Sequence, residues 1–127
     1  MTVVLDASAL LAFLQGEVGS DVVEELLSDD ARCAAVNWSE VAQKVRASGS
    51  DWPLARALLI SYGLQVEAST VDDAEWAAAR WRRGDGLSLA DRFCLALTER
   101  LAVPVWTADA AWGSEAPVRQ LRSAELR

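Results

Sequence analysis

Short β-prone apolar runs alternate with longer helix-forming segments along the chain, and this alternation constrains the fold more than any other feature. We expect strands at residues 2–5, 33–36, 64–67, 103–107 and 118–121, and helices at 7–14, 19–28, 38–47, 53–62, 71–83 and 89–101. Strands that alternate with helices usually form a parallel sheet, because the helices serve as crossovers. The sequence therefore predicts an α/β domain with a mainly parallel central sheet.

Length and composition fit one packed domain. The chain has 127 residues, of which 52% are hydrophobic, and single domains run to roughly 100–200 residues. We therefore treat residues 1–127 as a single domain. No apolar run approaches the roughly 18 residues of a membrane span, and Cys33 and Cys94 lack the CxxC spacing of redox or metal sites. We expect a cytoplasmic protein with structural cysteines and no membrane contact.

The charged residues restrict the chemistry further. The chain has no histidine and a net charge of −7. Without imidazole there is no histidine base, zinc ligand or triad member. The acidic balance argues against broad electrostatic adhesion to nucleic acid. Any catalysis must then depend on carboxylates, hydroxyls, thiols or local groups of basic side chains.

Acidic residues occur where predicted strands pass into helices. Because the carboxyl ends of parallel strands meet at one edge of a sheet, we expect four acids to converge there: Asp6, Glu40, Asp91 and Asp109. Each also has a local explanation. Asp6 and Asp109 can cap the turns that follow them, and Glu40 and Asp91 lie three residues after Asn37 and Ser88, which is the spacing of a capping box.

Capping explains each acid alone but not their convergence. Carboxylates gathered in one cleft repel one another and require a cation among them. Oxygen ligands without histidine or cysteine favour Mg²⁺ or Mn²⁺ over zinc. Divalent ions held by carboxylates activate water for phosphodiester hydrolysis. The four acids therefore predict a metal-dependent hydrolase of phosphodiesters.

Four segments carry a family resemblance across nearly the whole chain. They are residues 5–12 (LDASALLA), 36–41 (VNWSEV), 86–92 (GLSLADR) and 105–109 (VWTAD). In this order and approximate spacing they resemble the PIN-domain ribonucleases, and within them the VapC-type toxins of type II toxin–antitoxin pairs. Each segment alone is a weak signal, whereas the four together are specific.

The resemblance implies a three-layer α/β/α PIN-like fold, an Mg²⁺- or Mn²⁺-dependent endoribonuclease that leaves 5′-phosphate ends, and a cognate VapB-type antitoxin that covers the cleft. On it we assign Asp6, Glu40, Asp91 and Asp109 as catalytic, metal-binding acids, and Ser8 and Thr107 as supporting hydroxyls. Some family members carry a further acid just after the fourth. Ala110 and Ala111 stand there in this chain, without a ligand for a second metal.

Basic residues must be focused if an acidic chain is to bind RNA. The candidates for RNA contacts are Arg80, Arg83 and Arg92, and Trp76, Arg80 and Arg83 would share a helix face at i, i+4 and i+7. A solvated helix end, where arginine also suits the helix dipole, explains Arg80 and Arg83 equally well. The six tryptophans favour core or dimer packing, although tryptophan can also stack on unpaired bases.

Partner binding and rival functions stay open at this point. The acidic side of the second helix, with Glu17, Asp29 and Asp30, can attract a basic antitoxin segment, and the apolar first helix fits either a homodimer or burial within the chain. A receiver domain needs a lysine after a late strand, and the only lysine here, Lys44, lies in a predicted helix. A haloacid-dehalogenase-like phosphatase needs a second acid at position 8, where this chain has Ser8. The alternative that we keep is a non-catalytic PIN-like module that binds RNA or protein.

Overall fold

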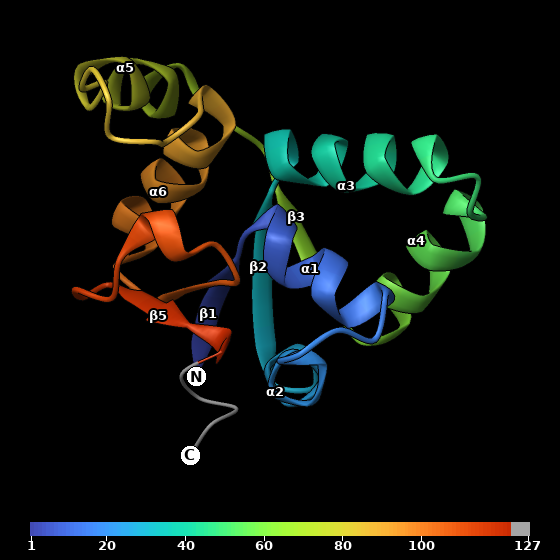
Figure 1. Ribbon diagram of the computed structural model, residues 1–127. Coiled ribbons are helices and arrows are strands. Elements are labelled where there is room, and N and C mark those ends of the chain that lie inside the picture. Colours follow the sequence, from blue (N-terminus) through green and yellow to red (C-terminus); the bar gives the residue numbers. More distant parts are fainter. Residues whose placement is uncertain (123–127) are drawn as a thin grey trace.

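The structure is a computed structural model that describes residues 1–122, in which strands and helices alternate (Figure 1). In chain order the elements are β1 (Thr2–Leu5), α1 (Ala7–Leu14), α2 (Ser20–Leu27), β2 (Asp30–Ala34), α3 (Ala35–Ala47), α4 (Trp52–Ser61), β3 (Gln65–Glu67), α5 (Val71–Ala79), α6 (Leu89–Leu101), β4 (Val105–Thr107), the 3-10 turn η1 (Ala110–Trp112) and β5 (Val118–Gln120). The predicted bounds of β1, α1 and α6 are confirmed.

The strands form one sheet in the order β3-β2-β1-β4-β5, and all of its neighbouring pairs are parallel. From β1 the chain first winds outward through β2 and β3, and later returns to place β4 and β5 on the other side. The strand order therefore reverses between β1 and β4. Open α/β sheets bind ligands beside such a reversal, at the carboxyl ends of the strands. The predicted α/β class is confirmed, with a wholly parallel sheet.

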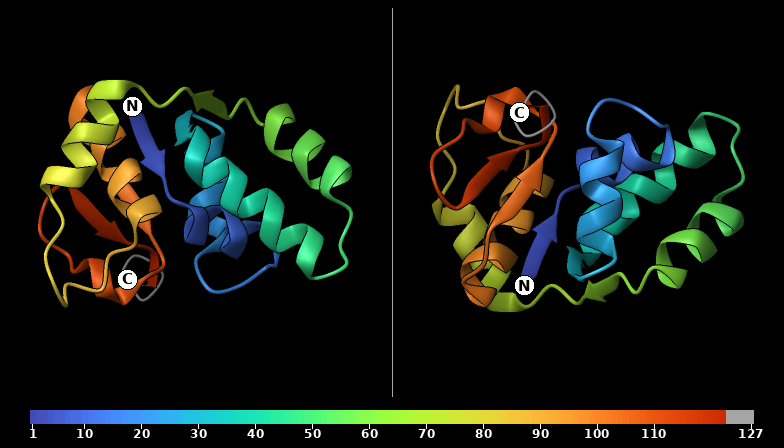
Figure 2. Two further views of the ribbon diagram at one scale, coloured as in Figure 1. Left: turned by 90° about the horizontal axis from the view of Figure 1, so that it is seen from above. Right: turned by 90° about the horizontal axis from the view of Figure 1, so that it is seen from below.

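Helices cover both faces of this sheet. Side chains alternate between the faces along a strand, so Val3 and Leu5 join the core formed with α1 to α4, whereas Val4 joins a second core with Cys94 and Leu97 of α6. Figure 2 shows α1, α3 and α4 on one side of β1, and α5 and α6 on the other. This three-layer α/β/α arrangement is the one that the family resemblance implies.

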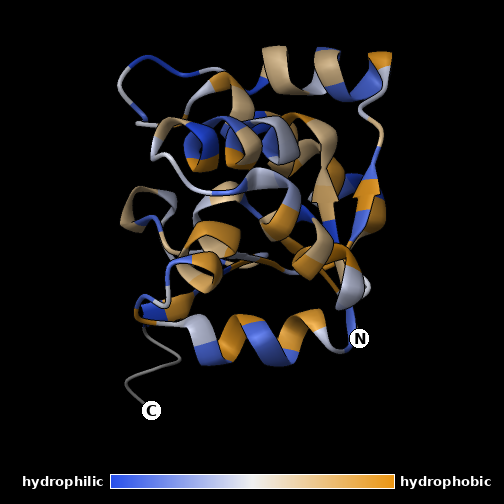
Figure 3. Cartoon of the chain, turned by 90° about the vertical axis from the view of Figure 1, so that its right-hand side faces the viewer, coloured by the Kyte–Doolittle hydropathy of each residue, from blue (hydrophilic) through white to orange (hydrophobic). Residues whose placement is uncertain are grey.

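The first two helices pack on the same face in different ways. Apolar side chains surround α1, and Ala9 and Leu10 are fully buried. Burial within the chain therefore accounts for its apolar character. In α2, Val23 and Leu27 are buried while the acidic side is exposed. Figure 3 shows this helix at the bottom of the view, with hydrophobic and hydrophilic residues alternating along it.

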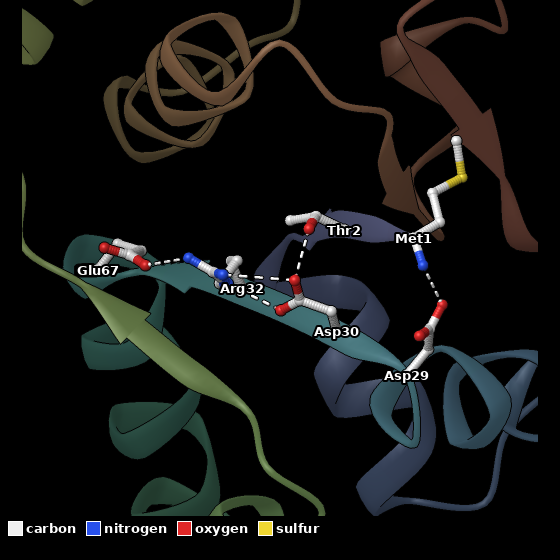
Figure 4. Close-up of polar contacts among 6 residues, drawn as sticks. All are labelled: Met1, Thr2, Asp29, Asp30, Arg32 and Glu67. Atoms are coloured by element: carbon white, nitrogen blue, oxygen red, sulfur yellow. Dashed lines mark hydrogen bonds and ion pairs between the residues drawn. The ribbon is translucent and has the colours of Figure 1, made fainter.

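Polar side chains link three neighbouring strands of the sheet, β1, β2 and β3 (Figure 4). Arg32 of β2 donates hydrogen bonds to Asp30 at 2.9 Å and to Glu67 of β3 at 2.7 Å. The Thr2 hydroxyl donates to Asp30 from β1, and the N-terminal ammonium pairs with Asp29. Asp29 and Asp30, two of the acids that can attract a basic partner, are thus paired within the chain.

The largest differences from the prediction lie at two places, the β2–α3 region and the end of α5. The β2 strand and α3 begin earlier than expected, because Ala34 is extended and serves as the N-cap without a side-chain hydrogen bond. At the other boundary α5 ends at Ala79 instead of residue 83, with Arg80 as its C-cap. The chain then turns through Gly84 and Gly86, whose φ angles of +80° and +77° lie in the left-handed region. Both shifts change the surroundings of candidate site residues.

Both cysteines are free and buried, as predicted. Burial raises the pKa of the Cys33 and Cys94 thiols, so neither carries the thiolate of a nucleophile. Among residues 1–122, none of the helices has the length and apolar character needed to cross a membrane.

Candidate active site

Asp6 lies at the end of β1, directly beside the point where the strand order reverses. It is only 3% exposed and serves as the N-cap of α1, where Oδ1 accepts a hydrogen bond from the Ala9 amide at 2.8 Å. The Thr107 hydroxyl donates to Oδ2 at 2.6 Å, and the Ser8 hydroxyl donates to both oxygens at 2.8 and 3.0 Å. The carboxylate is therefore held in one orientation.

The pKa of Asp6 is raised from 3.8 to about 6. Burial is the main cause, because it penalises the charged form. The hydrogen bonds from Thr107, Ala9 and Ser8 act in the opposite direction, and the negative charge of Asp91 raises the pKa further. The hydrogen bonds to the ionised Asp6 carboxylate do not fully offset the cost of its burial. A bound cation would stabilise the ionised form.

The two predicted hydroxyls join the end of β4 to Asp6. Ser8 Oγ accepts a hydrogen bond from the Ala108 amide at 2.9 Å, and Thr107 Oγ1 accepts one from the Asp109 amide at 3.0 Å. Each hydroxyl thus donates to the carboxylate while it accepts from the backbone after β4. The placement of Asp109 is therefore coupled to the placement of Asp6.

Glu40 lies in the second turn of α3, where Asn37 holds it. Asn37 is 1% exposed, and its Nδ2 donates to Glu40 Oε1 at 2.9 Å and to the Ala90 carbonyl of α6 at 3.1 Å. Its Oδ1 is buried without a recorded partner. Asn37 is not the N-cap that its spacing from Glu40 suggested, since α3 begins at Ala35. Instead it ties Glu40 to the first turn of α6, next to Asp91, a role that sequence reasoning missed.

Asp91 and Asp109 do serve as caps, as the local interpretation predicted. Asp91 forms a capping box with Ser88, in which Asp91 Oδ2 accepts from the Ser88 amide at 2.9 Å. Asp109 is the N-cap of η1, and its Oδ1 accepts from the Ala111 amide at 2.9 Å. In each case the cap engages one carboxylate oxygen. Gln120 Nε2 of β5 also holds the Asp109 carbonyl at 2.9 Å, a contact that no sequence signal indicated.

Three of the predicted acids act electrostatically on the two buried thiols, Cys33 and Cys94. The negative charge of Asp6 contributes to the raised pKa of both buried thiols, after burial itself, and so does that of Glu40. Asp91 acts on Cys94 and on Asp6 as well. Asp6 and Asp91 therefore lie within electrostatic reach of each other, Glu40 acts on the same two thiols, and the Thr107 hydroxyl links Asp109 to Asp6.

The donor chemistry of these residues fits a hard divalent cation. Every candidate ligand is a carboxylate oxygen, as Mg²⁺ and Mn²⁺ prefer. Glu40, Asp91 and Asp109 each keep one oxygen to which no donor from residues 1–122 is recorded. In the part of the chain that the structure describes, however, no group of three carboxylates or thiols is already arranged to hold an ion.

The three candidate RNA-contacting arginines have different surroundings. Arg92 is 7% exposed, and its Nη1 donates to the Ala77 carbonyl of α5 at 2.9 Å. It therefore ties α6 to α5 and offers no exposed guanidinium to a phosphate. Arg80 and Arg83 are exposed. They do not share one helix face, because α5 ends before Arg83.

Comparisons with known proteins agree with this fold. The PIN domain family matches residues 3–114. A VapC ribonuclease of Mycobacterium bovis is 35% identical to this chain over 115 residues, which cover 80% of the chain and 86% of that relative. Ribonuclease VapC42 of Mycobacterium tuberculosis is similar to the same extent.

Solved structures share the fold at lower sequence identity. A toxin–antitoxin complex from Klebsiella pneumoniae has a TM-score of 0.77 at 18% identity, covering 94% of this chain and 97% of that one. VapC20 of Mycobacterium tuberculosis, a sarcin–ricin loop cleaving toxin, has a TM-score of 0.68 at 19% identity, covering 87% and 95%. Together with the sequence relatives, these matches show that the chain belongs to the PIN-domain family and, within it, to the VapC group.

Proposed function

We propose that this protein is an Mg²⁺- or Mn²⁺-dependent endoribonuclease that acts as the toxin of a toxin–antitoxin pair. The observation that carries the proposal is the buried Asp6 carboxylate at the reversal of strand order, within reach of the charge of Asp91. The similarity to VapC ribonucleases supports the activity.

In this proposal Asp6, Glu40, Asp91 and Asp109 hold the metal. When bound, the cation supplies Lewis-acid activation of water and offsets negative charge on the phosphodiester. The chain's own contribution is to preorganise the ligands. Ser8 and Thr107 fix the Asp6 carboxylate, and Asn37 fixes Glu40 against α6. Preorganised ligands avoid the cost of ordering them when the metal and substrate bind.

For RNA we propose that Arg80 and Arg83 supply phosphate contacts. Both are exposed, and they lie on the segment that leads from α5 to Asp91. Arg92 is left out of this role because its guanidinium is buried against α5. Focused arginines of this kind can bind a polyanion although the net charge of the chain is −7.

We further propose a cognate VapB-type antitoxin as partner, cytoplasmic action and a homodimeric toxin. The toxin–antitoxin complex from Klebsiella pneumoniae, with its similar fold, supports an antitoxin. A hollow of about 680 Å³, lined by Ala12, Gly16, Glu17, Val18, Ala108 and Arg122, lies beside the end of β4. A partner segment seated there would approach Asp109, which follows Ala108 in the chain.

Cleavage of total cellular RNA by the purified, antitoxin-free chain tests the function. We expect discrete fragments with 5′-phosphate ends in Mg²⁺ or Mn²⁺, and none in EDTA or with Asp6→Asn. If the folded wild-type protein produces no Asp6-dependent fragments with either metal, the proposal fails. The remaining candidate is then a non-catalytic PIN-like binding module, which the absence of a preformed metal geometry among residues 1–122 would favour.

A further inference from the structure

Trp81 differs from the other tryptophans of the chain. It is 52% exposed, whereas the remaining five are buried or half-buried. Trp38, for example, packs edge-on against Trp52 with ring centroids 5.0 Å apart. About half of the Trp81 surface stays in contact with water, so core packing does not account for the exposed part of its indole.

Three arginines adjoin Trp81 in the sequence, and one of them lies over its ring. The Arg83 guanidinium lies over the Trp81 ring, 5.6 Å from its centroid, and Arg80 lies over Trp76 at 4.3 Å. Arg82 Nη1 donates to the Trp81 carbonyl at 3.0 Å, which fixes the backbone that carries the ring. Within residues 1–122, none of these three guanidiniums forms an ion pair with a carboxylate. Their positive charge is therefore available to an external anion.

The segment that carries Trp81 lies near the two elements that hold Asp91 and Asp109, which are two of the proposed metal ligands. The end of α5 is held against the first turn of α6, which contains Asp91, by the bond from Arg92 to the Ala77 carbonyl. Further along, Gly86 lies beside η1, since a Cβ built on it would be 3.7 Å from Ala111 Cβ. The loop that carries Trp81 therefore connects a position held against the first turn of α6, which contains Asp91, to one beside η1, which follows Asp109.

We propose that Trp81 and Arg83 form a platform on which an unpaired base of the RNA substrate stacks, next to the phosphate that is cleaved. The inference rests on the proposed nuclease function and names its substrate class, which is RNA that is single-stranded or looped at the site. An unpaired base can stack its aromatic face on the Trp81 indole, while the Arg83 guanidinium contacts the base or a phosphate. In a duplex both faces of each base are covered by its neighbours, so the platform discriminates against paired RNA. A symmetric contact of this patch with the same patch of a second copy is disfavoured, because it would bring like-charged arginines together.

Binding of a short single-stranded oligoribonucleotide in EDTA, where no cleavage occurs, tests the platform. One base of the probe is replaced by 2-aminopurine, whose fluorescence is quenched when it stacks, and the same strand annealed to its complement serves as the duplex probe. The variants are Trp81→Ala, Trp81→Phe and Arg83→Ala. Leu54→Ala is the control, because Leu54 of α4 is also an exposed apolar residue, at 68%.

We expect Trp81→Ala to weaken single-strand binding about ten-fold, within the range for an aromatic–base stack, and to abolish the quenching. Trp81→Phe should retain most of both. Arg83→Ala should lower the dependence of log affinity on log salt by about 0.7, the value for one phosphate contact on a single strand, whereas Trp81→Ala should leave it unchanged.

Wild-type affinity and quenching in Trp81→Ala would overturn the platform, and so would equal losses on single-stranded and duplex probes. A loss of self-association in Trp81→Ala, with RNA binding intact, would assign the ring to a protein contact instead. Failure of the platform is distinguishable from failure of the nuclease. The first leaves Asp6-dependent cleavage in place, and the second leaves stacking without cleavage.

Discussion

Replacing Asp6 by asparagine should stabilise the metal-free protein. The pKa of Asp6 rises from 3.8 to about 6 on folding, mainly through burial. Because each pKa unit corresponds to about 1.4 kcal/mol, the ionised carboxylate destabilises the folded state by about 3 kcal/mol above pH 6. Asparagine carries no charge and can still accept the hydrogen bond from the Ala9 amide. The variant should therefore gain up to about 3 kcal/mol, less any loss at Thr107 or Ser8.

The sign of the pH dependence follows from the direction of the pKa change. A raised pKa in the folded state means that folding takes up a proton between pH 4 and pH 6. The stability of the wild type relative to Asp6→Asn therefore falls as the pH rises through this range and is constant above it. In urea unfolding with EDTA, the midpoint of the variant should exceed that of the wild type by about 1–2 M at about pH 8, with little difference at about pH 4.

Asp51→Asn is the matched control for this experiment. Asp51 is also a helix N-cap, with Oδ1 accepting from the Leu54 amide at 3.1 Å, but it is exposed. Aspartate and asparagine are equivalent caps, so this substitution should leave the midpoint unchanged at either pH. The reasoning is refuted if Asp6→Asn is destabilising at about pH 8, or if its effect does not vary with pH.

Three further substitutions test the contacts that orient the site. Thr107→Val removes a hydrogen bond to the Asp6 carboxylate and should lower the free energy of unfolding by about 1.5–3 kcal/mol at a pH where Asp6 is ionised, and by less at lower pH. Urea unfolding at two pH values measures this difference, and a loss that does not depend on pH would contradict it. Asn37→Ala releases Glu40 from α6, so the metal concentration for half-maximal cleavage should rise several-fold, whereas an unchanged requirement would deny Asn37 its positioning role. Arg92→Met leaves a buried carbonyl of α5 without its hydrogen-bond donor and should lower the free energy of unfolding by about 1–3 kcal/mol. The RNA affinity of the folded variant should be unchanged. A loss of RNA affinity without a loss of stability would show that Arg92 contacts RNA.

The layered fold follows from local patterns that a sequence displays directly. Apolar runs such as β1, and helices with clear ends such as α6, are determined by neighbouring residues, so their bounds were predicted correctly. The capping interpretations of Asp6, Asp91 and Asp109 were also correct. Capping engages one oxygen of Asp91 and of Asp109 and leaves the other, so a cap and a metal ligand are compatible roles.

Contacts between distant segments could not be predicted in this way. Asn37 and Glu40 have the spacing of a capping box, yet α3 starts earlier at an alanine that makes no side-chain cap, so Asn37 turns inward to α6. The burial of Arg92 depends on how α5 packs on α6, which no local pattern reveals. The exposure of Trp81 follows from the early end of α5. In each case the packing of two elements decided the role.

Manganese binding, measured by EPR on the purified and folded chain, tests most directly whether Asp6, Glu40, Asp91 and Asp109 form a metal centre. Free Mn²⁺ gives a strong signal that is lost on binding, so affinity is read without any cleavage assay. We expect the wild type and Asp51→Asn to bind equally, and Asp6→Asn and Asp91→Asn to bind at least ten-fold more weakly, the loss of about one charged ligand contact. Equal Mn²⁺ affinity in the wild type and in both site variants would contradict the metal centre.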